Sequence, residues 1–122
     1  YLGENNYHRE VRWMLSEKMK EDLVRGLRLI FGDGIQMIIL YGSVARNEAT
    51  EESDIDIAII MKKDMEEVEK EQFIRWSAEM DIQYNKVFSI VDIREEQLEK
   101  WGDILPFYKN VREEGVVLWK AA

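Results

Sequence analysis

The sequence predicts an α/β protein of the α+β kind, with one small mixed β-sheet flanked by helices. Apolar residues recur every three or four positions before Phe31 and again after Asp64, which is typical of amphipathic helices. A wholly apolar run precedes Tyr41, and isoleucines alternate with other residues from Asp54 onward, as in buried strands. With 122 residues and no linker or repeat, residues 1–122 are expected to form a single domain.

The first half of the chain is expected to hold one long helix and two strands. The helix is predicted because its apolar residues keep helical spacing, and a glycine-rich turn ends it. The strands are predicted from an apolar run and from period-two alternation. The expected elements are a helix at His8–Phe31, a strand at Ile35–Tyr41, a helical turn at Ser43–Glu48, a loop at Ala49–Ser53 and a strand at Asp54–Met61.

The second half is expected to hold three helices around one strand. Asp64 and Glu67 predict the capping box of a helix whose apolar residues continue to Met80. A run rich in aromatic and β-branched residues predicts the third strand, and Pro106 and Gly115 delimit the last helix. The expected elements are a strand at Tyr84–Ile93, helices at Arg94–Trp101 and Leu105–Glu114, and an extended tail at Val116–Trp119.

The composition excludes several kinds of site. There is no cysteine, and the single histidine is His8, so thiolate sites and histidine-based triads built within this chain are excluded. A metal must then be held by oxygen, which favours Mg²⁺ or Mn²⁺. The net charge of −8 and the absence of a basic cluster argue against nucleic acid as a ligand. No apolar run approaches the ~20 residues that span a bilayer, so we expect a cytoplasmic protein.

Asp54 and Asp56 are the candidate catalytic and metal-binding residues. Residues i and i+2 of a strand point to the same face, with Cα atoms about 7 Å apart. Two carboxylates placed in this way can bridge two divalent ions, which stabilise the attacking and leaving oxygens of a displacement at phosphorus. The alternative is a solvent-facing pair of acids without a function, and this is the usual meaning of Asp-x-Asp when it stands alone.

Gly42, Ser43 and Arg46 are the candidate nucleotide-binding residues. A glycine at the end of a strand lets a phosphate approach the backbone, and serine adds a hydroxyl and an N–H donor. Arg46 lies one helical turn beyond Ser43, where it can reach a triphosphate. An ordinary turn is the alternative for Gly42 and Ser43, and a surface ion pair with Glu48 or Glu52 is the alternative for Arg46.

These two motifs carry a resemblance to a known family. Tyr41–Arg46 (YGSVAR) followed by Ser53–Ile57 (SDIDI) is similar to the signature of the DNA polymerase beta-like nucleotidyltransferase superfamily. The nearest branch is its minimal, stand-alone members of prokaryotes. The element order and the tail from Leu105 to Gly115 resemble those proteins as well, so the likeness extends over most of the chain. It implies the palm-like nucleotidyltransferase fold of polymerase beta.

The resemblance also implies a reaction and a partner. Gly42 and Ser43 would hold a nucleoside triphosphate such as ATP, Asp54 and Asp56 would ligate two Mg²⁺ ions, and an acceptor hydroxyl would attack the α-phosphorus. The acceptor would belong to a partner protein or a small molecule. Members of this size often pair with a small helical protein encoded nearby, as the antitoxin of a toxin–antitoxin pair. The sequence leaves open whether the chain forms a homo-oligomer.

One departure from the family pattern concerns a third carboxylate on the next strand, which active members use at the metal site. Its expected position here is Asn85, which offers a carbonyl oxygen but no negative charge. Asp81 and Asp92 flank that strand and are possible substitutes. An alternative function is therefore a catalytically degenerate, nucleotide-binding partner or antitoxin subunit without turnover.

Overall fold

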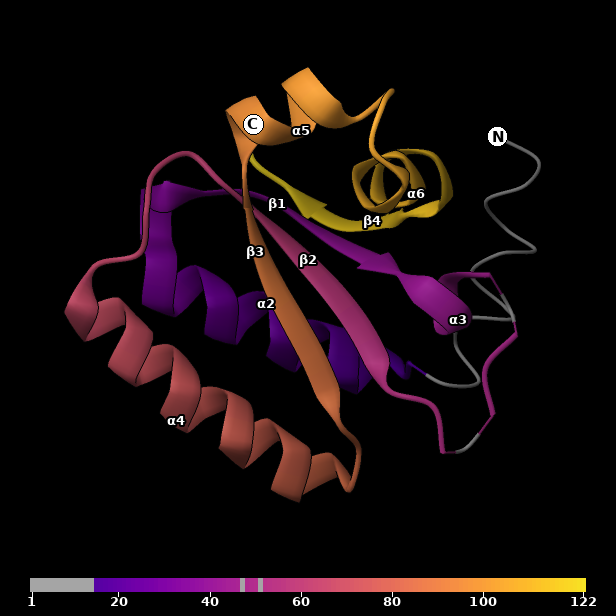
Figure 1. The fold of residues 1–122 in the computed structure, drawn as a ribbon. Helices are drawn as coiled ribbons and strands as arrows, with labels where there is room; N and C mark the ends of the chain where they lie inside the picture. The colour runs from indigo at the N-terminus through magenta and orange to yellow at the C-terminus, as the bar shows by residue number, and fades with distance from the viewer. Residues whose placement is uncertain (1–14, 47, 51) are drawn as a thin grey trace.

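The computed structural model describes residues 15–46, 48–50 and 52–122. The order of most helices and strands along the chain agrees with the order predicted from the sequence (Figure 1). The elements are α2 Glu17–Phe31, the 3₁₀ turn η1 Gly32–Gly34, β1 Ile35–Tyr41, α3 Gly42–Ala45, β2 Ile55–Met61, α4 Glu67–Tyr84, β3 Phe88–Arg94, α5 Glu95–Trp101, α6 Pro106–Glu114 and β4 Val116–Lys120.

The four strands form one mixed sheet in the order β3-β2-β1-β4. β1 is antiparallel to both β2 and β4, whereas β2 and β3 run parallel, joined by a crossover through α4. The predicted mixed sheet is thus confirmed. The stretch from Val116 to Trp119, expected to be only an extended tail, is part of a fourth strand that hydrogen-bonds to β1 at the edge of the sheet.

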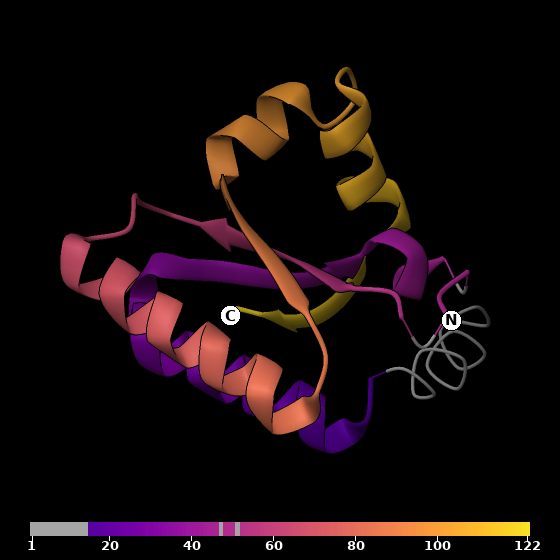
Figure 2. The same cartoon turned by 60° about the horizontal axis from the view of Figure 1, so that its bottom comes forward.

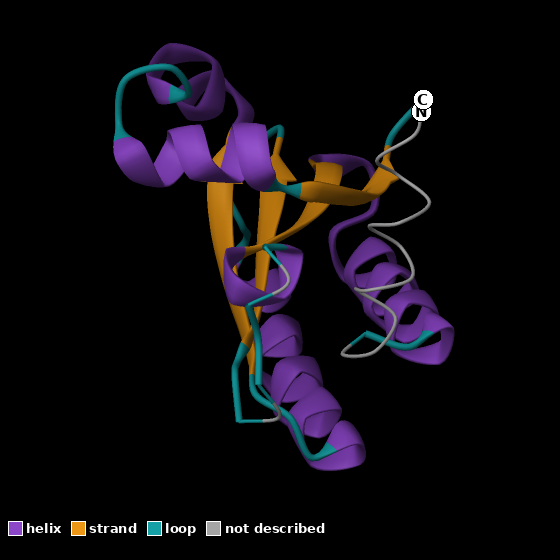
Figure 3. Ribbon diagram, turned by 90° about the vertical axis from the view of Figure 1, so that its right-hand side faces the viewer, coloured by secondary structure: helices purple, strands orange, loops and turns teal. Residues whose placement is uncertain are grey.

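Helices cover both faces of the sheet (Figure 3). α2 and α4 pack on one face and α5 and α6 on the other. Because side chains alternate along a strand, β2 supplies both cores: Ile55, Ile57 and Ile59 face α2 and α4, and Ala58 and Ile60 face the opposite side. Asp56 has the same parity as Ala58, so its carboxylate lies on the face of α5 and α6.

The first helix starts later than expected within the described residues. Ser16 is its N-cap, and its hydroxyl accepts a hydrogen bond from the Met19 N–H (3.2 Å). Residues 8–14 of the predicted helix lie outside the described part of the chain. None of the described helices is long and apolar enough to cross a lipid bilayer.

The prediction of a capping box at Asp64 and Glu67 is wrong. Glu66 is the N-cap of α4, and the Glu69 carboxylate accepts a hydrogen bond from the Glu66 N–H (2.9 Å). The Asp64 carboxylate instead accepts a hydrogen bond from the Arg94 guanidinium (2.7 Å) at the end of β3. A tertiary ion pair therefore holds the residue that the local pattern assigned to the helix start.

The predicted start of the third strand is also wrong. Tyr84 is the last residue of α4, and Asn85 caps that helix in the left-handed region, with φ of 51°. The Asp81 carboxylate accepts a hydrogen bond from the Phe88 N–H (2.9 Å), so it fixes the turn from α4 into β3. The strand begins at Phe88, four residues later than Tyr84.

Candidate active site

The candidate active site lies where β1 ends and β2 begins. Gly42 follows β1 directly with φ of 75°, in the left-handed region that favours glycine. A Cβ atom on Gly42 would lie less than 3.0 Å from Oδ2 of Asp56, so the absence of a side chain there lets the two segments approach closely. The two halves of the sequence motif are therefore in direct contact (Figure 2 shows α3 beside the start of β2).

The two aspartates differ in their surroundings. Asp54 is exposed and immediately precedes β2, whereas Asp56 is half-buried within it. Burial raises the pKa of Asp56, the charge of Asp54 raises it further, and Arg46 opposes both effects. The site therefore concentrates negative charge in a partly desolvated place, where a bound cation would favour the charged form of Asp56.

An aromatic wall flanks Asp56 on one side. Tyr41 is the residue opposite Asp56 in the β1–β2 register, and its ring meets that of Phe107 from α6 edge-on, with centroids 5.7 Å apart. Burial, and then the charge of Asp56, raises the pKa of the Tyr41 phenol. The sequence reasoning did not assign Phe107 to the site, because its position depends on how α6 packs against β1.

Ser43 lies in the short helix α3, which begins at Gly42, and Arg46 is the C-cap of that helix. Ser43 is half-buried, and its backbone carbonyl accepts a hydrogen bond from the backbone N–H of Glu48 (2.9 Å). The Arg46 guanidinium forms ion pairs with Glu48 (3.4 Å) and with Glu114 of α6 (3.6 Å). The ion pair with Glu48, which was the alternative to a nucleotide-binding role for Arg46, is therefore present, and Arg46 is also close enough to Asp56 to lower the pKa of that carboxyl.

Asn85 caps α4 and does not lie on the strand beside β2, where the residue opposite Asp56 is a serine. In the parallel β2–β3 register, Asp56 lies opposite Ser89, which has the same parity as Val91 and Ile93 and faces α5. Asp92 has the opposite parity and lies beside Ile59, so it is not a substitute. The alternation of Ser89 with the apolar residues Phe88 and Ile90 was the signal that could have identified this position.

The donor set suits a magnesium ion that is shared with a substrate. Among the described residues, no group of three or more histidine, cysteine or acidic side chains is placed to hold a metal. Mg²⁺ usually binds through one or two carboxylates, and substrate phosphates and waters complete its octahedron. Asp54 and Asp56 together fit this kind of site, with the Ser89 hydroxyl as a neutral neighbour.

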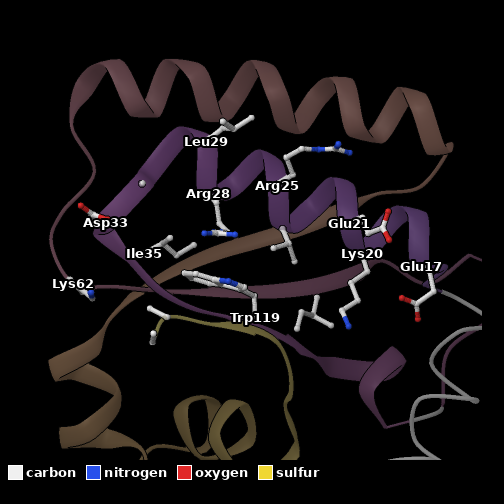
Figure 4. A pocket seen from close by; sticks show the side chains of 15 residues that line it. Glu17, Lys20, Glu21, Arg25, Arg28, Leu29, Asp33, Ile35, Lys62 and Trp119 are labelled. Atoms are coloured by element: carbon white, nitrogen blue, oxygen red, sulfur yellow. The ribbon is translucent and has the colours of Figure 1, made fainter.

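A groove along the described part of the chain lies away from the two motifs. It is a groove of about 1060 Å³ between α2 and β4, in which the Arg28 guanidinium lies over the ring of Trp119, 4.8 Å from its centroid (Figure 4). None of Gly42, Asp54 and Asp56 lines this groove.

Comparison with known proteins agrees with the fold and the motifs. The family profile described as "Polymerase beta, Nucleotidyltransferase" matches residues 29–121. This chain therefore belongs to the polymerase beta nucleotidyltransferase family, and it is a nucleotidyltransferase. A relative named "Putative protein adenylyltransferase MJ0604", from Methanocaldococcus jannaschii, is 36% identical over 109 residues, which cover 87% of this chain and 100% of the relative.

Two solved structures share the fold. One is described as a toxin–antitoxin with AMP-PNP. It has a TM-score of 0.59 at 19% identity, and the matched region covers 84% of this chain and 73% of the chain in that structure. The other is a tri-AMPylated HEPN toxin of Shewanella oneidensis in complex with an MNT antitoxin. It has a TM-score of 0.54 at 19% identity, covering 84% of this chain and 70% of the other. Both structures therefore share the fold of this chain.

Proposed function

We propose that this chain is a Mg²⁺-dependent enzyme that moves a nucleoside monophosphate, AMP from ATP, onto a hydroxyl of a partner protein or small molecule. The observation that carries the proposal is the close approach of Gly42 to the Asp56 carboxylate. A backbone without a side chain, beside a pair of carboxylates, is what a triphosphate and its metal ions need.

The residues of the site have separate roles in this proposal. Gly42 and Ser43 receive the phosphates through the backbone and the serine hydroxyl, and Arg46 exchanges a glutamate partner for a phosphate oxygen. Asp54 and Asp56 hold two Mg²⁺ ions. When bound, these ions neutralise charge on the attacking and leaving oxygens. The acceptor oxygen forms a bond to the α-phosphorus, and pyrophosphate leaves.

The test combines the protein, each nucleoside triphosphate, Mg²⁺ and a candidate partner, and weighs the intact proteins by mass spectrometry. An acceptor should gain the mass of one nucleoside monophosphate, and most readily that of AMP. The variant Asp54→Asn/Asp56→Asn should abolish the gain, whereas Asp92→Asn, on the opposite face of the sheet, should not. The proposal fails if no acceptor gains mass and the double variant binds nucleotide and Mg²⁺ as the wild type does.

The acceptor that we favour is a small helical protein encoded nearby, with the pair acting in the cytoplasm as a toxin and its antitoxin. Two observations support it: the relative from Methanocaldococcus is named for adenylyl transfer to protein, and the neighbours in structure are toxin–antitoxin complexes. Co-expression of the adjacent genes tests it. Growth arrest by the neighbour alone, relieved by this chain, is the expected result.

The second candidate is a degenerate subunit that binds nucleotide without turnover, and Ser89 is the observation that favours it. A hydroxyl opposite Asp56 supplies neither the charge nor the basicity of a third carboxylate. If this candidate is correct, the wild type should bind nucleotide without transferring it, and Ser89→Asp should create transfer and tighten Mn²⁺ binding. Rapid turnover by the wild type would exclude it.

A further inference from the structure

Three aromatic rings gather beside Asp56, on the face of the sheet that carries its carboxylate. Tyr41 and Tyr108 pack against the core between the sheet and the helices α5 and α6. The Phe107 ring meets both of them edge-on, with its centroid 5.7 Å from that of Tyr41 and 5.5 Å from that of Tyr108. We call Tyr41, Phe107 and Tyr108 the ring cluster. Because β1 supplies Tyr41 and α6 supplies the other two rings, the cluster forms where α6 docks on the sheet.

Phe107 is the accessible member of the ring cluster. It is 42% exposed, whereas Tyr41 and Tyr108 are half-buried. The preceding residues Ile104 and Leu105 are also exposed, so apolar groups gather where α5 joins α6. Phe107 differs from these two in its ring contact with Tyr41, which brings it to the candidate site. A flat apolar surface that is open to water beside a charged site suits a flat ligand group.

The helix α6 connects the ring cluster with the phosphate-binding end of the proposed site. It packs against α3 and β1 (Figure 2). Glu114, its last residue, forms an ion pair with Arg46 (3.6 Å), whereas Phe107, its second residue, contacts Tyr41. The step from Phe107 to Glu114 corresponds to about 10 Å along the helix axis. The exposed ring and the proposed phosphate ligand Arg46 are therefore held at a separation that a nucleotide can span.

Asp56 lies between these two ends of the site. Tyr41 is its partner in the β1–β2 register, and both Tyr41 and Arg46 lie within electrostatic range of the Asp56 carboxylate. Gly42, which would receive the phosphates, approaches the same carboxylate. A nucleoside triphosphate that lies along α6 can thus place its phosphates between Gly42 and Arg46 and its α-phosphorus beside the acids. Its base then reaches the ring cluster.

We infer that Phe107 binds the base of the nucleotide by stacking and makes the site select purines over pyrimidines. The inference rests on the proposed function and adds the residue that recognises the base. Every base can stack on an aromatic ring through its π face, and the two fused rings of a purine cover more of that ring than a pyrimidine does. The edge-on contacts with Tyr41 and Tyr108 hold the Phe107 ring in place, which lowers the entropic cost of binding.

The test measures Kd by calorimetry, with and without Mg²⁺, for ATP, CTP and inorganic tripolyphosphate, which has no base. The wild type should bind ATP more tightly than CTP. Phe107→Leu keeps an apolar side chain but removes the ring, so it should weaken the binding of ATP by at least about fivefold. It should also reduce the preference for ATP over CTP and leave the binding of tripolyphosphate unchanged. Phe107→Trp restores a ring and should restore the preference.

Ile104→Ala is the matched control. It removes an apolar side chain that is 65% exposed from the connection between α5 and α6, in which no ring is lost. It should change the Kd of each of the three ligands by no more than about twofold. A loss of ATP binding as large as that in Phe107→Leu would show that the exposed apolar surface, and not the ring, is responsible, and would overturn the inference.

The other outcomes separate this inference from the function on which it rests. Binding of tripolyphosphate that requires Mg²⁺, and that is lost in Asp54→Asn/Asp56→Asn, reports the phosphate and metal site alone. If that binding is present but the wild type binds ATP and CTP equally, the inference about the base is overturned. It is also overturned if Phe107→Leu weakens tripolyphosphate as much as ATP. If neither ligand binds the wild type with Mg²⁺, the proposed function fails as well.

Discussion

Gly42 is the residue on which the geometry of the candidate site depends most directly. Gly42→Ala puts a Cβ atom against the Asp56 carboxylate and forces alanine into a left-handed conformation. We expect it to lower the free energy of unfolding by about 1–3 kcal/mol and to abolish Mg²⁺-dependent nucleotide binding, measured by urea denaturation and calorimetry.

Gly32 provides the matched control for that substitution. It also has a positive φ, of 52°, but a Cβ atom there would meet nothing within 4 Å. Gly32→Ala should therefore show the conformational cost and keep nucleotide binding intact. Loss of binding in both variants would mean that backbone strain, and not the contact with Asp56, determines the effect.

Asp56 makes stability depend on pH. Its pKa is raised in the folded state by burial and by Asp54, so the folded protein favours the protonated form. The resulting destabilisation is absent below the unfolded pKa of about 4 and grows as the pH rises through the folded pKa. Without metal, Asp56→Asn should raise Tm at pH 7, and this gain should disappear below about pH 4.

Mg²⁺ should make the wild type more thermally stable than Asp56→Asn, the reverse of the order expected without metal. Addition of Mg²⁺ with an ATP analogue should stabilise the wild type and leave Asp56→Asn nearly unchanged, because the variant has lost one carboxylate ligand. Differential scanning fluorimetry across pH measures both effects. An equal response of the two proteins to Mg²⁺ would show that Asp56 is not a ligand.

The residue-scale features that the sequence predicts are those within one local segment. Gly42 and Asp56 are recognisable because the motif that contains them is a hairpin-like pair of neighbouring strands. Ser89 was missed because its place opposite Asp56 depends on the register between β2 and β3, which α4 separates in the sequence. The strand was predicted to start at Tyr84, but α4 continues to that residue and Asn85 caps the helix in the left-handed conformation. Asn85 was therefore assigned to a strand that begins only at Phe88.

At the scale of elements, the contact between α2 and α4 is set by Gly26. A Cβ atom there would lie less than 3.0 Å from the indole nitrogen of Trp76. Gly26→Ala gains about 1 kcal/mol in helix propensity, but overpacking of this kind costs about 1–3 kcal/mol. We therefore expect net destabilisation, measured by urea denaturation.

A double-mutant cycle isolates the contact. Trp76→Leu removes the indole, so Gly26→Ala in that background should stabilise the protein by the helix-propensity gain. If Gly26→Ala is equally destabilising in both backgrounds, the close packing against Trp76 is not the reason for the glycine.

The two strands next to the candidate site were predicted best. β1 and β2 have the expected type, and their bounds differ from the prediction by no more than one residue. β4 was expected only as a tail because Val116 and Trp119 gain their partners from β1, far away in the sequence. Pairing between distant segments is decided by tertiary packing, which local propensity does not record.

At the scale of the whole molecule, ligand binding should appear as stability. If Mg²⁺ and an ATP analogue bind only the folded chain, a hundredfold excess over Kd adds about 2.7 kcal/mol. For a domain of this size, that corresponds to a rise in Tm of roughly 10 °C. Asp54→Asn/Asp56→Asn should show no rise, and a rise of equal size in that variant would contradict the proposed site.

The pairing of β4 with β1 has a consequence for how the protein is made. β1 is an uncharged and strongly apolar segment, IQMIILY, and one of its edges stays open until residues 116–120 have been synthesised. Open apolar edges recruit other strands. On the ribosome, the nascent chain therefore carries an aggregation-prone edge from the synthesis of β1 until that of β4, and chaperone binding to the segment at Ile35–Tyr41 would protect it during that interval.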